Sequence, residues 1–243
     1  MTSVARAKSV TWLAPDDRTY WFPPIEQALD EPNGLLAAGG DLAPGRLLAA
    51  YRRGIFPWYS PGQPILWWSP DPREVLKPAN FHRNRSLVKA IRSRNLVITF
   101  DQAFEQVIDA CAAPRRYSSG TWITQAMRDA YVELHRLGAA HSVETWCDGR
   151  LIGGVYGVSQ GKIFFGESMF SHEANGSKAA LAALAERAEN SGCALIDCQF
   201  ASPHLRRLGS IALPRADFRR LLETLVVAPT APTFAQSAAI AFS

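Results

Sequence analysis

The segment from residue 151 to residue 199 constrains the fold more than any other part of the chain. It reads in order as a strand, a tight turn, a second strand, a polar loop, a helix and a third strand. Strands are predicted at residues 154–158 and 163–165, where apolar and aromatic residues lie between glycines. The helix is predicted to begin at Asn175-Gly176-Ser177 and to end before Gly192. Strands and a helix in such close succession predict a domain of the mixed α/β class.

The third strand, residues 194–198, carries a carboxylate in an apolar segment. Side chains alternate along a strand, so Asp197 and Gln199 are expected on one face. A buried aspartate needs a partner, and the nearest candidate donor is the side-chain amide of Gln199. On the preceding strand, Glu167 closes a row that contains Ile163 and Phe165. Sites often lie at strand ends in mixed α/β folds, which makes both acids candidate site residues; the alternative is that they cap loops or face solvent.

The composition is that of a folded chain. Of its 243 residues 47% are hydrophobic and 20% are charged, which excludes a largely disordered protein, and the net charge of +4 permits a polyanionic partner. The cysteines form no CxxC pair and the histidines no HExxH motif, so no metal site is expected and the thiols are interpreted as buried in a reducing compartment. No signal sequence or membrane-spanning stretch is evident, which predicts a soluble cytoplasmic protein.

Residues 1–72 are predicted to form a small N-terminal domain that includes an aromatic and proline-rich wall. Its segment GIFPWYSPGQPILWWSPDPR has four prolines from residue 57 to residue 70, which argues against a long helix or a central strand. The same segment concentrates aromatic rings: Trp58, Tyr59, Trp67 and Trp68. These rings either form the core of a rigid interdomain wall or offer a surface for stacking against a flat ligand.

A basic stripe follows in the segment FHRNRSLVKAIRSRN. Arg85, Lys89 and Arg92 are spaced i, i+4, i+7, which places them on one face of a predicted helix, and Arg83 precedes them. The segment contains no acidic residue. Such a stripe is either a solvated face or a contact with a phosphate backbone.

From residue 96 the predicted elements follow the order of the GNAT-type N-acyltransferases: strand, helix, helix, three strands, helix, strand, helix. In the acetyl-CoA users of that fold, a glycine-rich loop holds pyrophosphate at a helix N-terminus. The corresponding loop, FSHEANGSKAAL, lacks the basic-xx-Gly-x-Gly pattern, which argues against CoA as the donor. Residues 73–228 are therefore predicted to be a GNAT-like acyltransferase domain with a mixed sheet, and residues 229–243 an uncharged, disordered tail.

More specific evidence comes from eight strings that the chain contains in this order: EPNGLLAAGGDL, YRRGIFPWYSPGQPILWWSPDPR, GTWIT, AHSVE, GGVYG, FFGESMFS, NGSK and LIDCQ. From about Trp21 to about Leu222, the chain closely resembles the leucyl/phenylalanyl-tRNA–protein transferases. The resemblance implies transfer of Leu or Phe, and Met less well, from tRNA to the N-terminal amine of proteins that begin with Arg or Lys. In bacteria this addition marks proteins for the N-end rule degradation pathway. Aminoacyl-tRNA is an activated ester, so no cofactor is expected.

The resemblance also implies roles for residues of this chain. Asp197 and Gln199 match the proposed catalytic pair, in which the carboxylate polarises the amide and the amide oxygen accepts a proton from the attacking amine. Glu167 matches an acid near that amine and near the positive end of the acceptor. Residues that match positions around the aminoacyl-adenosine end are Tyr51, Trp58, Trp122 and Tyr131. Candidates for the acyl pocket are Val155, Ser168, Met169 and Phe170. Some relatives have Met at position 155, so Val is expected to change the width of the pocket.

With this resemblance, the basic residues Arg83, Arg85, Lys89 and Arg92 become candidates for contact with the tRNA backbone. The expected partners are Leu-tRNA, Phe-tRNA and acceptor proteins with N-terminal Arg or Lys, with no membrane, and the chain is expected to be a monomer. The sequence leaves open the natural acceptors, the relative preference for Leu, Phe and Met, and whether Gln199 or a substrate hydroxyl takes the proton.

Three other functions are compatible with parts of the sequence. The first is a CoA-dependent N-acetyltransferase with a degenerate loop. The second is a non-enzymatic tRNA-binding module, which would leave Asp197 and Glu167 without a task. The third is a transferase of the related Fem fold, which the lack of a duplicated GNAT-like half disfavours.

Overall fold

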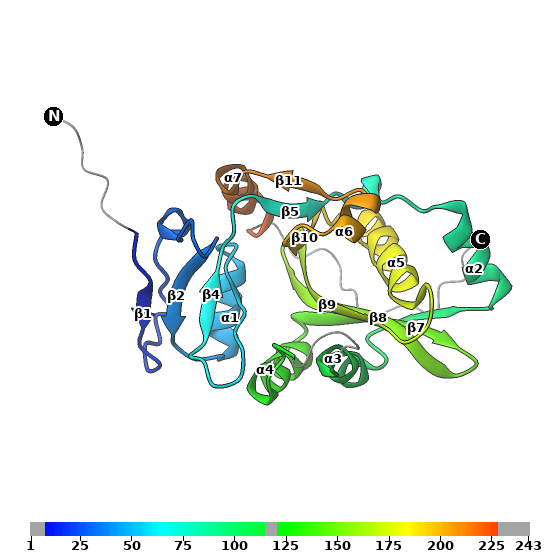
Figure 1. The fold of residues 1–243 in the computed structure, drawn as a ribbon, viewed down its shortest axis with the longest axis horizontal. Coiled ribbons are helices and arrows are strands. Elements are labelled where there is room, and N and C mark those ends of the chain that lie inside the picture. Colours follow the sequence, from blue (N-terminus) through cyan, green and yellow to red (C-terminus); the bar gives the residue numbers. More distant parts are fainter. Residues whose placement is uncertain (1–7, 115–120, 228–243) are drawn as a thin grey trace.

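The chain forms two β-sheets, the smaller of which comes first in the sequence (Figure 1). The computed structural model describes residues 8–114 and 121–227; the predicted tail, residues 229–243, lies outside this part. The strands of the first sheet are β1 (Thr11–Leu13), β2 (Leu35–Gly39), β3 (Phe56–Pro57) and β4 (Leu66–Trp68). Their order is β1-β2-β4-β3, in which β1 and β2 are parallel. The helix α1 (Pro44–Tyr51) lies on the side that faces the second sheet.

The second sheet is mixed. Its strands are β5 (Arg73–Leu76), β6 (Val97–Phe100), β7 (Ala140–Cys147), β8 (Arg150–Gln160), β9 (Ile163–Ser171), β10 (Leu195–Gln199) and β11 (Ile211–Leu213). They lie in the order β11-β5-β10-β9-β8-β7-β6. Only the central pair, β9 and β10, is parallel among the strand pairs described for this sheet.

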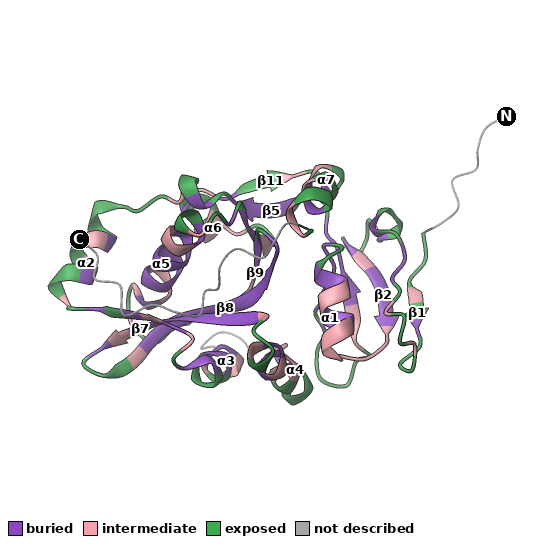
Figure 2. Ribbon diagram, turned by 180° about the vertical axis from the view of Figure 1, so that it is seen from behind, coloured by how far each residue is buried: buried purple, intermediate pink, exposed green. Residues whose placement is uncertain are grey.

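Helices cover both faces of the second sheet (Figure 1). On one face α5 (Gly176–Asn190) packs across β7, β8 and β9, and α2 (Arg85–Ser93) lies beside α5. On the other face lie α3 (Phe104–Ala112) and α4 (Gln125–Arg136). The short α6 (Pro203–Arg207) follows β10, and α7 (Arg215–Leu225) ends the described chain, with single 3-10 turns at Ile25–Gln27 and Pro78–Asn80. Between these layers β8 is buried along most of its length (Figure 2), whereas β9 is buried from Ile163 to Phe165 and half-buried from Gly166 to Met169.

The predicted mixed α/β class and mixed sheet are confirmed, and the element order expected of a GNAT-like domain is present from β6 onward. Within residues 73–228 the prediction omitted the short strands β5 and β11 and the short helix α6. One exclusion was wrong: β4 is an inner strand of the first sheet, although it lies in the proline-rich segment. Its three residues contain no proline, because Pro64 and Pro70 stand outside it, so its backbone can pair on both sides.

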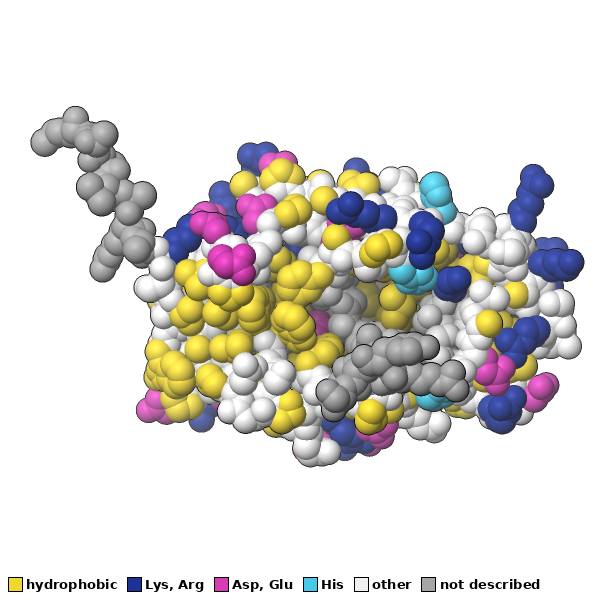
Figure 3. Space-filling view, in the orientation of Figure 1, with side chains coloured by type: hydrophobic (Ala, Val, Ile, Leu, Met, Phe, Trp, Pro, Cys, Tyr) yellow, Lys and Arg dark blue, Asp and Glu magenta, His cyan; other side chains and the backbone are white. Residues whose placement is uncertain are grey.

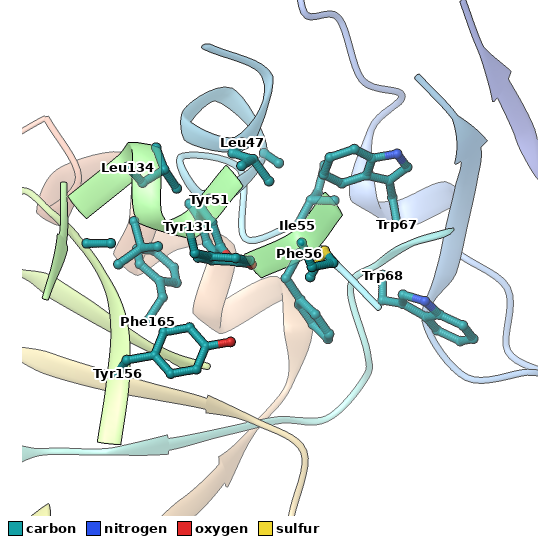
Figure 4. Close-up of a cluster of buried hydrophobic side chains, with 14 of the residues drawn as sticks. Leu47, Tyr51, Ile55, Phe56, Trp67, Trp68, Tyr131, Leu134, Tyr156 and Phe165 are labelled. Atoms are coloured by element: carbon teal, nitrogen blue, oxygen red, sulfur yellow. The ribbon is translucent and has the colours of Figure 1, made fainter. Parts of the chain in front are cut away.

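The two sheets share one hydrophobic cluster, which includes Leu36 and Trp67 of the first sheet and Phe165 of the second. The tyrosine rings of α1 and α4 point towards each other between the sheets (Figure 4). At Gly54, a Cβ atom would overlap the side chains of Phe218 and Leu222 of α7, so the chain after α1 lies tight against this helix. The chain passes from one sheet to the other between residues 68 and 73; a domain division after residue 72 stays a prediction.

Candidate active site

The parallel strands β9 and β10 separate at the residues that the sequence singled out. Their register is paired from Leu195 and Ile163 as far as Asp197 and Phe165. Beyond this point β9 contains a bulge: against β8, Gly157 pairs with Gly166 and Tyr156 with Ser168, so Glu167 is the extra residue. A bulge turns its side chain away from the regular alternation and often lies beside an active site.

A second bulge lies in β10. Against β5, Asp197 pairs with Val75 and Gln199 with Glu74, so Cys198 is the extra residue. Gln199 has a φ of 55°, which lies in the left-handed region that residues other than glycine rarely adopt. The expected alternation of Asp197 and Gln199 on one face is therefore interrupted. The two bulges together open the sheet between Glu167 and Asp197.

Arg73 of β5 holds the carboxylate of Asp197. Its Nε donates to Oδ1 at 2.8 Å and its Nη2 donates to Oδ2 at 2.6 Å, and the two side chains are 1% and 0% exposed. The remaining guanidinium nitrogen, Nη1, donates to the carbonyl of Gly54 at 3.0 Å. The rings of Phe56 and Phe218 each lie 4.8 Å from the guanidinium carbon. Charged groups that are buried this completely require a partner of opposite charge with charge-assisted hydrogen bonds.

The prediction that the side-chain amide of Gln199 is the partner of Asp197 is wrong. Gln199 instead donates its backbone N–H to Asp197 Oδ1 at 3.0 Å, and its side-chain Nε2 faces Glu167 Oε1 at 3.5 Å. The bulge at Cys198 is the physical reason, because it shifts Gln199 out of the alternating pattern. Asp197 thus fixes the backbone of Gln199 and leaves the amide side chain at the site.

Glu167 lies in a cluster of tyrosines. Tyr131 donates its hydroxyl to Glu167 Oε2 at 2.9 Å, and the hydroxyl of Tyr51 makes a short hydrogen bond with that of Tyr131. Burial raises the pKa of Glu167 from 4.5 to about 7, and the charge of Asp197 adds to the rise, whereas the tyrosine hydrogen bonds oppose it. Burial also raises the pKa of both tyrosines well above the ordinary value. The cluster therefore presents a carboxyl group that can gain or lose a proton near neutral pH.

A cavity of about 240 Å³ opens at the separation of β9 and β10. Its walls are mainly apolar and come from β8, β9, β10, α5, α6 and Trp122. The apolar residues that line it are Trp122, Val155, Met169, Leu181, Leu184, Ile196 and Leu205. Glu167, Asp197 and Gln199 line its polar part, together with Ser168. A hollow is visible on this face of the molecule, bordered by hydrophobic side chains (Figure 3).

The structure brings most of the predicted site residues to this cavity. Trp122, Val155, Ser168 and Met169 line it, and Tyr51 and Tyr131 are linked to it through Glu167. Phe170 lines a neighbouring cavity instead. Trp58 is 40% exposed and lies outside the lining, with its ring 5.5 Å from that of Phe200. Within the aromatic segment Trp67 is fully buried, as the core alternative requires, whereas Trp58 is accessible. Stacking of a ligand on Trp58 stays a prediction.

The sequence reasoning missed Arg73 and the α5 residues Leu181 and Leu184. A signal for Arg73 was present, since a buried aspartate demands a cation and Arg73 stands at the end of the motif SPDPR. The signal for the α5 residues was weaker, because a helix body rich in Ala and Leu does not reveal which of its apolar residues line a cavity.

The predicted basic stripe lies on the exposed face of α2. Arg85, Lys89 and Arg92 line a shallow surface depression, and no ion pair involves them in the part of the chain that the structure describes. Arg83 differs, since it pairs with Glu186 of α5 at 2.9 Å. Within residues 8–114 and 121–227 there is no group of three His, Cys, Asp or Glu side chains that could hold a metal ion, and no helix long and apolar enough to cross a membrane.

Comparisons with known proteins agree over nearly the whole chain. Residues 75–223 match the family model of the leucyl/phenylalanyl-tRNA protein transferases, and residues 40–71 match the model of their N-terminal domain. The leucyl/phenylalanyl-tRNA–protein transferase of Stutzerimonas stutzeri is 56% identical over 222 residues, which cover 91% of this chain and 97% of that protein. The enzyme of the same name from Pseudomonas entomophila is 58% identical over 209 residues, 86% of this chain and 92% of that protein.

Among solved structures, a ribosomal-protein-alanine N-acetyltransferase from Brucella melitensis matches 61% of this chain and 99% of its own at 17% identity, with a TM-score of 0.33. The matches in sequence are much stronger than this structural match. They extend over both sheets and include the residues around the cavity. The chain belongs to the leucyl/phenylalanyl-tRNA–protein transferase family.

Proposed function

We propose that this protein, as an aminoacyltransferase of its family, transfers Leu or Phe from aminoacyl-tRNA to the N-terminal α-amine of proteins that begin with Arg or Lys. The transferred residue would serve as a degradation tag of the N-end rule pathway, in the cytoplasm and with the enzyme acting as a monomer. The observation that carries this proposal is the apolar cavity that opens between β9 and β10 and has Glu167, Asp197 and Gln199 in its polar part.

The cavity suits an apolar side chain of the transferred amino acid that is not branched at Cβ. Its walls offer aliphatic, thioether and indole groups from Leu181, Met169 and Trp122, and no charged group in the apolar part. One methylene in such a pocket changes the transition-state free energy by only about 1–3 kcal/mol. Selection of Leu and Phe over β-branched residues must therefore come from the shape of the pocket near the Cβ atom, where Val155 is one of the walls.

The polar part suits attack by an amine on an ester. The acceptor α-amine has an ordinary pKa of about 7.7–8, so part of it is neutral near pH 7. Its nitrogen attacks the carbonyl carbon of the aminoacyl ester; the C–N bond forms, the C–O bond to the ribose breaks, and the ribose oxygen leaves with a proton. Glu167, with a pKa of about 7, is matched to receive the proton that the amine releases and to return one to the ribose oxygen.

The remaining polar groups position the reactants. Arg73 and Asp197 form a fixed ion pair, and Asp197 holds the backbone of Gln199. The side-chain carbonyl of Gln199 is then available to accept a hydrogen bond from the attacking amine. A carboxylate at position 167 also favours an acceptor with a positive charge, in line with Arg or Lys at the acceptor N-terminus. The exposed face of α2, with Arg85, Lys89 and Arg92, supports a contact with the tRNA backbone.

The test offers Leu-tRNA and Phe-tRNA to the protein with peptides that begin with Arg, Lys or Ala and are otherwise identical. Transfer to the first two peptides alone is expected. Acetyl-CoA replaces the tRNA in a parallel reaction; acetylation of the peptide there, without transfer from tRNA, would refute the proposal. A charge reversal at Lys89 and Arg85 is expected to weaken tRNA binding and to flatten its dependence on salt.

A further inference from the structure

A second cavity adjoins the acyl cavity, and the two share Met169 as a wall. It has a volume of about 690 Å³ and lies between the end of α3, the end of β9 and the first turn of α5. Its apolar lining includes Phe170 and Ala110. Its polar lining consists of two imidazoles, His172 and His204, and two serines. The proposed transfer chemistry gives the polar lining of this cavity no role.

The rim of this cavity is basic. Burial lowers the pKa of His204, and the positive charges of Lys178 and Arg207 lower it further, which places both cations beside this imidazole. No carboxylate pairs with Lys178 or Arg207 among the residues that the structure describes. The histidine and basic side chains gather over α5 and α6 at one edge of the central hollow (Figure 3).

Glu173, which follows His172 in the sequence, already has cationic partners of its own. Glu173 makes a short ion pair with Arg94 and a second one with Arg150 at 3.1 Å. The first turn of α5 contains no acidic residue, and Lys178 lies in it. A lysine there opposes the helix dipole, and a bound anion would offset this repulsion.

The rim is also held in place. A Cβ atom at Gly153 of β8 would overlap the backbone of Gly176, so the start of α5 rests directly on the sheet. Thr145 of β7 donates its hydroxyl to the carbonyl of Gly176 at 2.9 Å. The positive groups thus keep a fixed position relative to Met169 and the acyl cavity.

We infer that this cavity binds a phosphodiester group of the donor nucleic acid, close to the nucleoside that carries the amino acid. The inference rests on the proposed function. Its basic rim, next to a site for an uncharged acyl group, matches the charge of a nucleic acid strand. The same rim repels an acceptor with N-terminal Arg or Lys, so the acceptor is expected to approach the polar part of the acyl cavity from another side.

The test compares two short donors that differ in one phosphate. One is the phenylalanyl ester of adenosine; the other is the same ester of the dinucleotide CpA. The wild-type protein is expected to use the dinucleotide with the higher kcat/KM. In Lys178→Gln and His204→Gln, this advantage should fall about tenfold, the loss typical of a hydrogen bond to a charged group. The ratio of the two kcat/KM values is insensitive to partial loss of active protein.

A matched control removes the same charge elsewhere. Lys162→Gln alters an exposed lysine in the turn before β9, at the opposite end of the strand, and should leave the ratio unchanged. Equal use of both donors by the wild-type protein, or an unchanged ratio in the Lys178 and His204 variants, would overturn the inference. Transfer from neither donor by the wild-type protein would refute the proposed function itself, and the inference with it.

Discussion

Asp197 and Glu167 lie within neighbouring parallel strands, yet their surroundings differ. Asp197 receives two hydrogen bonds from the guanidinium of Arg73 and one from a backbone N–H. Glu167 receives one from a tyrosine hydroxyl and faces an amide at 3.5 Å. Burial beside a guanidinium keeps a carboxylate charged and fixed, whereas burial among neutral hydroxyl groups raises its pKa into the neutral range. One sheet thus produces a structural anion and a titratable group a few ångströms apart.

The largest expected effect comes from removing the cation. In Arg73→Met, the fully buried carboxylate of Asp197 loses its partner, and the free energy of unfolding should fall by about 3–5 kcal/mol. Urea denaturation measures this loss. The control Arg219→Met breaks two exposed pairs, with Glu223 and Glu26, and should cost no more than about 1 kcal/mol. The double variant Arg73→Met/Asp197→Leu should regain most of the stability without regaining transfer. A loss in Arg73→Met no greater than in the control would show that the pair does not hold Asp197.

Replacement of the other acid should separate activity from stability. Glu167→Gln removes the proton acceptor, and kcat/KM for transfer should fall at least about 100-fold. Stability should not fall at pH 8. The pKa of Glu167 rises from 4.5 to about 7 on folding, so the folded protein retains a proton that the unfolded chain releases. The free energy of unfolding of the wild-type protein therefore falls by up to about 3 kcal/mol as the pH rises from 4.5 through 7. The free energy of unfolding of the variant does not show this fall.

The same conservative change at Asp197 provides the contrast. Asp197→Asn leaves the buried guanidinium of Arg73 without a counter-charge, so the free energy of unfolding of this variant should fall. Denaturation of both variants at pH 5 and pH 8 tests the difference. If Glu167→Gln is also destabilised at pH 8, the two carboxyl groups are alike and the distinction drawn here is wrong.

A smaller change should shift the titration of Glu167 without abolishing transfer. The hydrogen bond from Tyr131 lowers the pKa of Glu167, so Tyr131→Phe should raise this pKa further. Because the ionised form accepts the proton, the pH of half-maximal kcat/KM should rise by about one unit. Tyr156→Phe is the matched control, since the Tyr156 hydroxyl has no hydrogen-bond partner among the described residues. Equal profiles for the two variants, measured with one acceptor peptide, would show that Tyr131 does not tune the acid.

The local part of this arrangement was predictable from the sequence. The strands and the helix of residues 151–199 follow from glycine boundaries and apolar runs, which depend on neighbouring residues. Glu167 and Asp197 are conspicuous because each interrupts an apolar row. The pairing of Arg73 with Asp197 joins residues 124 positions apart and depends on β5 lying beside β10, which no local pattern encodes. The two bulges were also hidden, because a strict alternation gives no sign of an extra residue.

The smallest expected effect concerns the apolar part of the acyl cavity, next to Glu167 and Asp197. Val155 is 4% exposed and lines the cavity, so Val155→Met should narrow it. The kcat/KM for Phe relative to Leu should fall about tenfold, because Phe fills more of the cavity and a pocket of this kind discriminates by about 1–3 kcal/mol. Val158→Met on the same strand is the control: it overpacks the cluster on the other face of the sheet, does not line the cavity, and should change stability alone. An unchanged Phe-to-Leu ratio in Val155→Met, measured with the two charged tRNAs in competition, would place the acyl group outside this cavity and leave Glu167 and Asp197 without a neighbouring substrate.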